Sequence, residues 1–197
     1  MKEYLQFIRH KAYKMRRASL KSTTEASSGH PTTCLSAADL MATIFFYAME
    51  FDPHKPSAPE NDYFILSKGH AAPLLYAAWK EVFEEEFQYD LLSLRKFDSV
   101  LEGHPTPRCD FVEVATGSLG QGLSIGVGMA LHEKWKNTSS YTYVMLGDSE
   151  LTEGSNWEAA AIAAHHDLSG LIAVIDANRL GQSTATLAGH NLERYER

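Results

Sequence analysis

The sequence predicts an α/β domain of three layers, with helices on both sides of a mainly parallel sheet. Its strongest signal is a strand–helix–strand unit. Residues 141–146 and 171–176 are short, apolar and strand-like, and the alanine-rich segment 154–168 between them has helical spacing. Two strands joined by such a helix run parallel. Residues 64–66 form a third short apolar run, which we interpret as a buried strand.

The elements of the first third follow from periodicity and from turn-forming residues. Residues 1–21 carry seven Lys or Arg residues among apolar side chains and predict a surface helix. A polar stretch covers 22–33. Ser36, with Asp39 three positions later, is typical of a capping box that would open the next helix. Three prolines make 52–61 a loop.

The middle of the chain combines helices with a glycine-rich loop. Residues 72–83 and 90–97 predict helices, and 111–115 a weak strand. The loop 116–122 then opens a helix that runs to about Trp135. Its order G-x-x-G-x-G differs from the dinucleotide fingerprint, and no acidic residue in the right context follows about 20 positions later. A nicotinamide or flavin site is therefore disfavoured, although glycines let a backbone approach some other ligand closely.

Asp148 and Asn178 lie 30 positions apart (178 − 148), each just past the carboxyl end of a predicted strand. That edge of an open α/β sheet is where ligands bind. A carboxylate and an amide oxygen are hard donors that suit Mg²⁺ or Ca²⁺, and Mg²⁺ completes its shell with phosphate and water. The helix beginning near Gly154 offers N–H groups to an anion. The pattern predicts a metal-bridged diphosphate.

Three histidines, His30, His70 and His104, each follow a glycine in a predicted loop or at an element end. Imidazole titrates near neutrality and suits proton transfer or the binding of oxyanions and hydroxyls. A zinc site of three histidines is the alternative, but no HExxH-type spacing supports it. Glu153 and Glu158 fit first-turn acids of the following helix, and we expect Glu158 to point into the protein.

Composition excludes several classes of function. With 18 basic and 25 acidic residues the net charge is −7, which argues against nucleic acid as the main partner. Two cysteines are too few for a disulfide framework and fit a reducing setting. No apolar segment indicates a secretory signal or spans a membrane. We therefore expect a cytoplasmic protein.

Six collinear motifs resemble those of the transketolase family, most closely the animal-type enzymes. They are Ser-Gly-His-Pro at 28–31, Ser-Lys-Gly-His-Ala-Ala-Pro at 67–73, Gly-His-Pro at 103–105, Ala-Thr-Gly-Ser-Leu-Gly-Gln-Gly at 115–122, Gly-Asp-x-Glu at 147–150 and Asp-x-Asn-Arg-Leu-Gly-Gln-Ser at 176–183. The resemblance implies that residues 1–197 form the amino-terminal thiamine diphosphate-binding (PP) domain, incomplete at its carboxyl end. The pyrimidine and carboxyl-terminal domains would be absent.

The resemblance also implies a role for each matching residue. Mg²⁺, or Ca²⁺ in its place, would be held by Asp148, Asn178 and the carbonyl of Leu180. The reacting sugar hydroxyls would be surrounded by His30, His70 and His104. The residues that would line thiamine diphosphate are Thr33, His70, Gly117, Ser118, Leu119, Ser149 and Asn178.

Transketolases transfer a two-carbon ketol unit from a ketose phosphate to an aldose phosphate. Their active site forms between the diphosphate domain of one subunit and the pyrimidine domain of another. The resemblance therefore implies sugar phosphate substrates, and a homo- or heterodimer with the missing pyrimidine-domain half or with full-length transketolase. The isolated chain is expected to be inactive.

Two alternatives stay open. The chain could be a shortened paralogue that binds the cofactor weakly or regulates full-length transketolase, or it could derive from another thiamine diphosphate enzyme such as a dehydrogenase E1 component. Ser149 stands where the family usually has glycine, and serine would weaken cofactor binding if that position needs a positive φ. Thr33 replaces the usual serine, which is a milder change.

Overall fold

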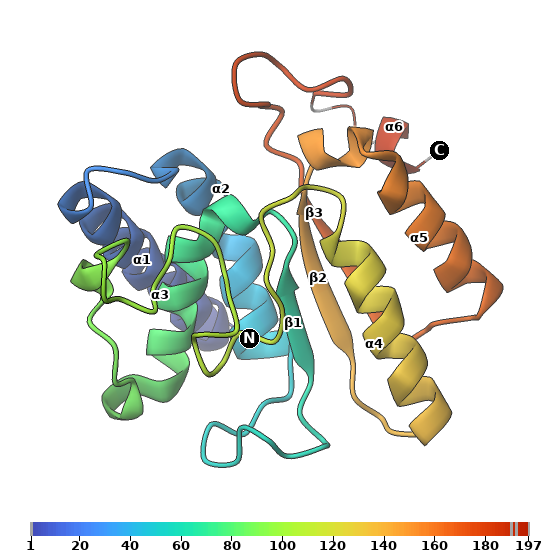
Figure 1. The fold of residues 1–197 in the computed structure, drawn as a ribbon, viewed down its shortest axis with the longest axis horizontal. Coiled ribbons are helices and arrows are strands. Elements are labelled where there is room, and N and C mark those ends of the chain that lie inside the picture. The colour runs from blue at the N-terminus through green and yellow to red at the C-terminus, as the bar shows by residue number, and fades with distance from the viewer. Residues whose placement is uncertain (1, 190, 192, 197) are drawn as a thin grey trace.

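A parallel sheet of three strands forms the centre of the protein (Figure 1), in a computed structural model that describes residues 2–189, 191 and 193–196. The strands are β1 (Tyr63–Leu66), β2 (Thr142–Gly147) and β3 (Leu171–Asp176), in the order β1-β2-β3. Both neighbouring pairs are parallel, so all three carboxyl ends lie at one edge. This confirms the parallel sheet and its three expected strands.

Helices cover both faces of the sheet. One face carries α1 (Lys2–Glu25), α2 (Pro31–Thr43) and α3 (Ala72–Phe83), whereas the other carries α4 (Gly122–Lys136) and α5 (Gly154–His165) (Figure 1). Separate hydrophobic clusters fill the two sides. Strand β2 is buried along its whole length, as a central strand covered on both faces must be. The three-layer prediction is confirmed.

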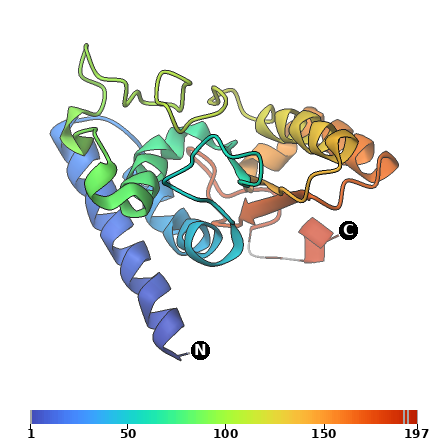
Figure 2. The same cartoon turned by 90° about the horizontal axis from the view of Figure 1, so that it is seen from below.

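Only part of helix α1 packs into the hydrophobic core. Its amino-terminal end projects past α2 and α3 (Figure 2) and exposes Tyr4, Leu5 and Phe7, whereas Met15 further along is fully buried. Phe7 packs edge-on against Phe46 at 6.0 Å between ring centroids. None of the helices in the described part of the chain is both long enough and apolar enough to cross a membrane.

Helix α2 begins earlier than the capping-box pattern predicts. It starts at Pro31, whose fixed φ suits the first helical turn, and His30 is its N-cap residue. The Ser36 hydroxyl instead donates to the Asp176 carboxylate at 2.8 Å, and Asp39 pairs with Arg16. The capping-box prediction is therefore wrong because both side chains have tertiary partners.

Three further local expectations are wrong. Residues 90–97 form only a short 3₁₀ turn, Leu91–Ser93. Residues 111–115 form no strand, because the chain turns where the Val112 N–H donates to the Cys109 carbonyl at 2.9 Å. Glu158 is exposed on α5 rather than directed inward. The short helix α6 (Glu193–Glu196) ends the described chain.

Candidate functional site at the carboxyl ends of the strands

The turns that follow β2 and β3 meet at one edge of the sheet. Gly147 is in register with Asp176, so Asp148 and Asn178 leave adjacent parallel strands at nearly the same height. The Asp148 N–H donates to the Asp176 carbonyl at 3.3 Å. The Asp148 carboxylate in turn accepts the Arg179 N–H at 2.6 Å. The residue next to Asn178 is therefore bonded to Asp148, and the expected convergence of these turns is present.

The carboxylate of Asp148 is buried, with only 3% of the residue exposed. Its oxygens accept from neutral donors, which are the N–H groups of Ser149 (3.0 Å) and Arg179 (2.6 Å) and the hydroxyls of Thr186 (3.0 Å) and Tyr195 (3.5 Å). Within the described ranges, no lysine, arginine or histidine side chain pairs with it. Burying a carboxylate is costly, and hydrogen bonds, an opposite charge or a metal offset the cost. At the edge of the sheet where ligands bind, the Asp148 carboxylate is a candidate ligand for a metal cation.

Asn178 is held by hydrogen bonds to its own turn and to Asp176. Its Oδ1 accepts the Leu180 N–H at 2.9 Å, and its Nδ2 donates to Asp176 Oδ2 at 3.2 Å. These bonds fix which side of the amide is oxygen, and that oxygen keeps a second lone pair. The Leu180 side chain is 61% exposed, so this residue contributes to the turn through its backbone. The donor set matches what Mg²⁺ or Ca²⁺ prefers.

The three glycine-preceded histidines lie on loops that converge. The rings of His30 and His70 are 5.2 Å apart between centroids. A Cβ on Gly69 would lie 2.7 Å from the Gly117 nitrogen, and a Cβ on Gly117, whose φ is +144°, would lie 2.8 Å from Cδ2 of His104. Glycine is therefore required at both contacts. The glycine-rich loop packs between the loops of His70 and His104.

Burial, together with the nearby Lys68 ammonium, His30 and His104, lowers the pKa of His70 to about 4. Burial, with Arg95 nearby, also lowers the pKa of His104. Both imidazoles are therefore neutral at neutral pH, and each offers one donor and one acceptor nitrogen to a hydroxyl. Among the residues that the structure describes, no group of three or more His, Cys, Asp or Glu side chains could hold a metal, which leaves the zinc alternative without support.

Thr33 is the one predicted cofactor residue that lies within an α-helix, in the first turn of α2. It is 8% exposed, and its Oγ1 is buried without a hydrogen-bond partner. Such an orphaned hydroxyl needs an explanation, and a bound polar ligand would supply one. Ser118 and Leu119 lie on the glycine-rich loop, where the Ser118 hydroxyl is exposed and accepts from Gln121 Nε2 at 3.1 Å.

The strain expected at Ser149 is absent. Ser149 begins the 3₁₀ turn Ser149–Thr152 and is not among the non-glycine residues with positive φ in the described chain. Serine therefore fits this backbone as well as glycine would, and the argument for weakened cofactor binding through backbone strain is wrong. Position 179, where arginine has a φ of 64°, is the left-handed residue of this edge.

Sequence reasoning missed three buried charged residues beside the site: Lys68, Glu150 and Asp176. The Lys68 ammonium lies 2.6 Å from Asp176 Oδ2, and both side chains are almost fully buried. Glu150 is 1% exposed and accepts from the Ser67 hydroxyl and from the N–H groups of Gly120 and Gly147. A signal existed for Asp176, since it is the one charged residue of an apolar strand. Glu150 belongs to the motif at 147–150, but its bonds to Ser67 and Gly120 join remote parts of the chain and could not be read from that motif.

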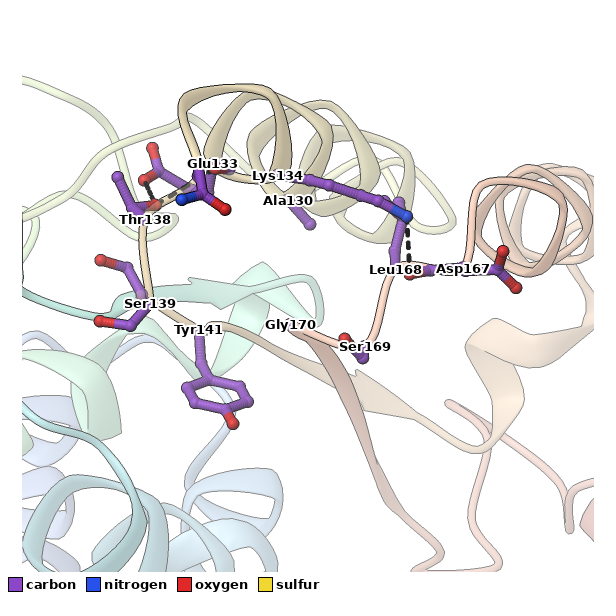
Figure 3. Close-up of a pocket in the computed structure, with 12 residues that line it drawn as sticks. Ala130, Glu133, Lys134, Thr138, Ser139, Tyr141, Asp167, Leu168, Ser169 and Gly170 are labelled. Carbon is purple, nitrogen blue, oxygen red and sulfur yellow. Dashed lines mark hydrogen bonds between the residues drawn. The ribbon is translucent and has the colours of Figure 1, made fainter.

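Two cavities lie away from this edge of the sheet. One of about 310 Å³ opens at the amino ends of β2 and β3, between the end of α4 and residues 167–170 (Figure 3). Lys134 crosses it and donates to the carbonyls of His166 (2.6 Å) and Asp167 (3.2 Å). A second, of about 300 Å³, lies along α4 beside Tyr63. No predicted site residue lines either cavity.

A parallel sheet with an acidic turn, an asparagine turn and a glycine-rich loop at its carboxyl edge defines an α/β domain of the thiamine diphosphate-binding class. The family model described as the thiamine diphosphate binding domain of transketolase matches residues 8–196. The chain belongs to the transketolase family, which confirms the resemblance drawn from the six motifs.

Relatives and solved structures agree with this assignment. The transketolase of Pongo abelii is 49% identical over 195 residues, and transketolase-like protein 2 of Mus musculus is 50% identical over 194 residues; each match covers 98% of this chain and 31% of the relative. A transketolase structure from Campylobacter jejuni superposes with a TM-score of 0.86 at 28% identity, covering 96% of this chain and 31% of that one. A Pichia stipitis transketolase variant in complex with xylulose-5-phosphate gives 0.83 at 31% identity, covering 96% and 30%. The chain thus spans about a third of its relatives' length.

Proposed function

We propose that this chain supplies the diphosphate-binding part of a transketolase-type enzyme, which moves a two-carbon ketol unit from a ketose phosphate to an aldose phosphate. The observation that carries the proposal is the buried Asp148 carboxylate, which is 3% exposed and lies where β2 and β3 end, bonded to the turn that follows β3 through the Arg179 N–H. A cation on a diphosphate is a partner that suits this arrangement.

Asp148, Asn178 and the Leu180 carbonyl would hold Mg²⁺, and the metal would bridge to the diphosphate. Thr33, with its unpartnered hydroxyl, supports a polar ligand against α2. Thiamine diphosphate and its diphosphate group would lie against the glycine-rich loop and Ser149, near His70. The bound cofactor supplies the carbon nucleophile of the reaction, and the protein binds and orients it.

The three histidines would position the sugar. His70 and His104 have lowered pKa values and are neutral at neutral pH, so each can donate one hydrogen bond and accept another. Neutral imidazoles suit a substrate rich in hydroxyls, because they orient O–H groups and can relay a proton between them. His30 lies against His70 and would extend this set.

A second polypeptide segment would complete the active site. Residues 1–197 match about a third of the length of their relatives. The proposed partner is a pyrimidine-binding part, either the missing half or full-length transketolase, in a homo- or heterodimer. The structure of a relative with xylulose-5-phosphate supports sugar phosphates as substrates. The free, buried Cys34 and Cys109 fit a reducing compartment such as the cytoplasm.

The decisive measurement is calorimetric titration of the purified chain with thiamine diphosphate, with and without Mg²⁺. We expect Mg²⁺-dependent binding in the wild type, loss of at least about tenfold in affinity in Asp148→Asn, and wild-type behaviour in the exposed control Glu158→Gln. Binding that ignores Mg²⁺, or that survives in Asp148→Asn, would contradict the assigned metal site.

Coexpression with a pyrimidine-domain chain tests the reaction itself. Ketol transfer in the mixture, absent from either chain alone, is the expected result. Co-purification with full-length transketolase and a changed turnover, without transfer by the mixture, would instead identify the regulatory paralogue.

A further inference from the structure

We infer that Glu150 is a positioning residue that holds three loops of the candidate site in register. The loops are Ser67–Ala71, Gly117–Gly122 and the turn that begins at Gly147. Its carboxylate is bonded to all three, and the residue is 1% exposed. The link between this register and thiamine diphosphate binding rests on the function proposed above.

Each oxygen of the Glu150 carboxylate has defined partners. Oε1 accepts the Ser67 hydroxyl at 2.5 Å and the Gly120 N–H at 2.9 Å, while Oε2 accepts the Gly147 N–H at 3.0 Å. Ser67 and Glu150 are 83 positions apart, and Gly120 and Glu150 are 30 apart. The carboxylate thus joins segments that no local turn connects.

The neighbouring backbone leaves Glu150 little freedom to adjust. Its own carbonyl accepts Asn156 Nδ2 at 2.7 Å, which anchors it to the first turn of α5. The Gly120 carbonyl accepts the Ser155 hydroxyl at 2.7 Å, so the same turn of α5 also holds the glycine-rich loop. If the carboxylate moved, it could not stay bonded to all three loops at once, and their relative positions would change.

Only a carboxylate satisfies this junction. A glutamine has one acceptor oxygen and one NH₂ group, which can only donate. The Ser67 hydroxyl can rotate and accept from that NH₂ group, but the N–H groups of Gly120 and Gly147 cannot reverse. In either amide orientation, one of these two N–H groups faces another donor and loses its acceptor.

The affected groups adjoin predicted site residues. Gly120 follows Ser118 and Leu119, Gly147 precedes Asp148, and Ser67 lies three positions before His70. A shift of any one loop would therefore move a diphosphate-facing or metal-facing group relative to the other two. Glu150 acts through these neighbours and is not itself placed against the ligand.

The test compares Glu150→Gln with two controls in the full chain. Glu158→Gln makes the same chemical change at an exposed position of α5. Ile8→Val removes a methylene from a buried side chain of α1 and should lower stability without touching the three loops. Titration with thiamine diphosphate and Mg²⁺ gives the affinity, thermal unfolding gives the stability, and ¹⁵N-resolved NMR follows the amides of Gly120 and Gly147.

We expect Glu150→Gln to lower the affinity on the order of tenfold and to move the Gly120 or Gly147 amide, with changes that reach Gly117 and His70. Ile8→Val should lower the unfolding temperature without changing affinity or these amides. A Glu150→Gln chain that keeps wild-type affinity, or that differs only in stability as Ile8→Val does, overturns the inference.

Failure of the proposed function can be distinguished from failure of the role inferred for Glu150. If the wild type binds no thiamine diphosphate, that function fails, and the amides alone decide the role of Glu150: changes in all three loops support it, and changes confined to 149–151 refute it. If Glu150→Gln does not fold, Ser67→Ala removes one donor and leaves both N–H bonds in place. It should then move the His70 signals and spare Gly120 and Gly147; unmoved His70 signals would overturn the inference.

Discussion

The buried ion pair between Lys68 and Asp176 gives the sharpest stability prediction. Lys68→Met keeps the length and apolar stem of the side chain and removes the ammonium group. The Asp176 carboxylate would then retain only neutral donors, the Ser36 hydroxyl at 2.8 Å and Asn178 Nδ2 at 3.2 Å. Because both ion-pair side chains are almost fully buried, at 1% and 6% exposed, water cannot replace the lost cation.

The expected cost follows from this burial. Removal of one partner from a buried pair costs about 3–5 kcal/mol, since it leaves an uncompensated charge in a low-dielectric interior. A matched control is the exposed pair of Arg108 and Glu102, whose side chains are 58% and 36% exposed. Arg108→Met should cost less than about 1 kcal/mol, because solvent already screens that pair.

Urea unfolding followed by circular dichroism measures both changes as free energies of unfolding. The double variant Lys68→Met/Asp176→Leu adds a direct check, because it removes the stranded charge and should be more stable than Lys68→Met alone. The reasoning is refuted if Lys68→Met costs no more than Arg108→Met, or if the double variant is the least stable of the set.

Three further predictions follow from the geometry of the site. The pKa of His70 is about 4 in the folded protein and near 6.5 in the unfolded chain, so the unfolded chain binds more protons between these two pH values. The contribution of His70 to stability is therefore complete above pH 6.5 and is lost as the pH falls towards 4. The loss should be about 1–3 kcal/mol after discounting for partial exposure. His70→Asn should flatten urea-unfolding stability over that range, and an unchanged slope would contradict this. Gly117→Ala should destabilise the protein by about 1–3 kcal/mol in the same assay, because its φ is +144° and the added Cβ would lie 2.8 Å from His104. The control Gly128→Ala, inside α4 with nothing within 4 Å, should instead stabilise the protein by about 1 kcal/mol, since alanine is the better helix former; a loss of stability in both variants would contradict the reasoning. Ser149→Gly should leave thiamine diphosphate affinity within about twofold in calorimetry, since Ser149 has no positive φ; a large gain would show that the serine side chain itself hinders close contact with the phosphate.

The sequence predicted the elements whose signals are local. The run 141–146 and the observed strand Thr142–Gly147 differ by one residue at each end, and 171–176 is reproduced in full. Hydrophobic runs bounded by turn residues identify buried strands well, because burial on both faces demands continuous apolar side chains. The convergence of Asp148 with the turn after β3 followed from parallel topology alone.

The features that escaped prediction depend on distant partners. Ser36 and Asp39 match a helix-start pattern, but their side chains bond Asp176 and Arg16, which only the tertiary fold brings near. Glu150 lies in a short motif that draws attention to Asp148, and its bond to Ser67 spans 83 positions. The spacing of residues within one segment carries no information about bonds to distant segments, so the roles of these residues are visible only in the folded structure.

The strand order has a kinetic consequence. Strand β1 pairs with β2, and Tyr63 meets Thr142, which lies 79 positions later (142 − 63). During synthesis, more than a third of the chain must therefore be made after β1 before its partner strand β2 is available. Such non-local parallel pairing slows folding and leaves apolar edges open to aggregation in the interval. We expect the yield of soluble protein to depend on growth temperature and chaperone supply more than on equilibrium stability.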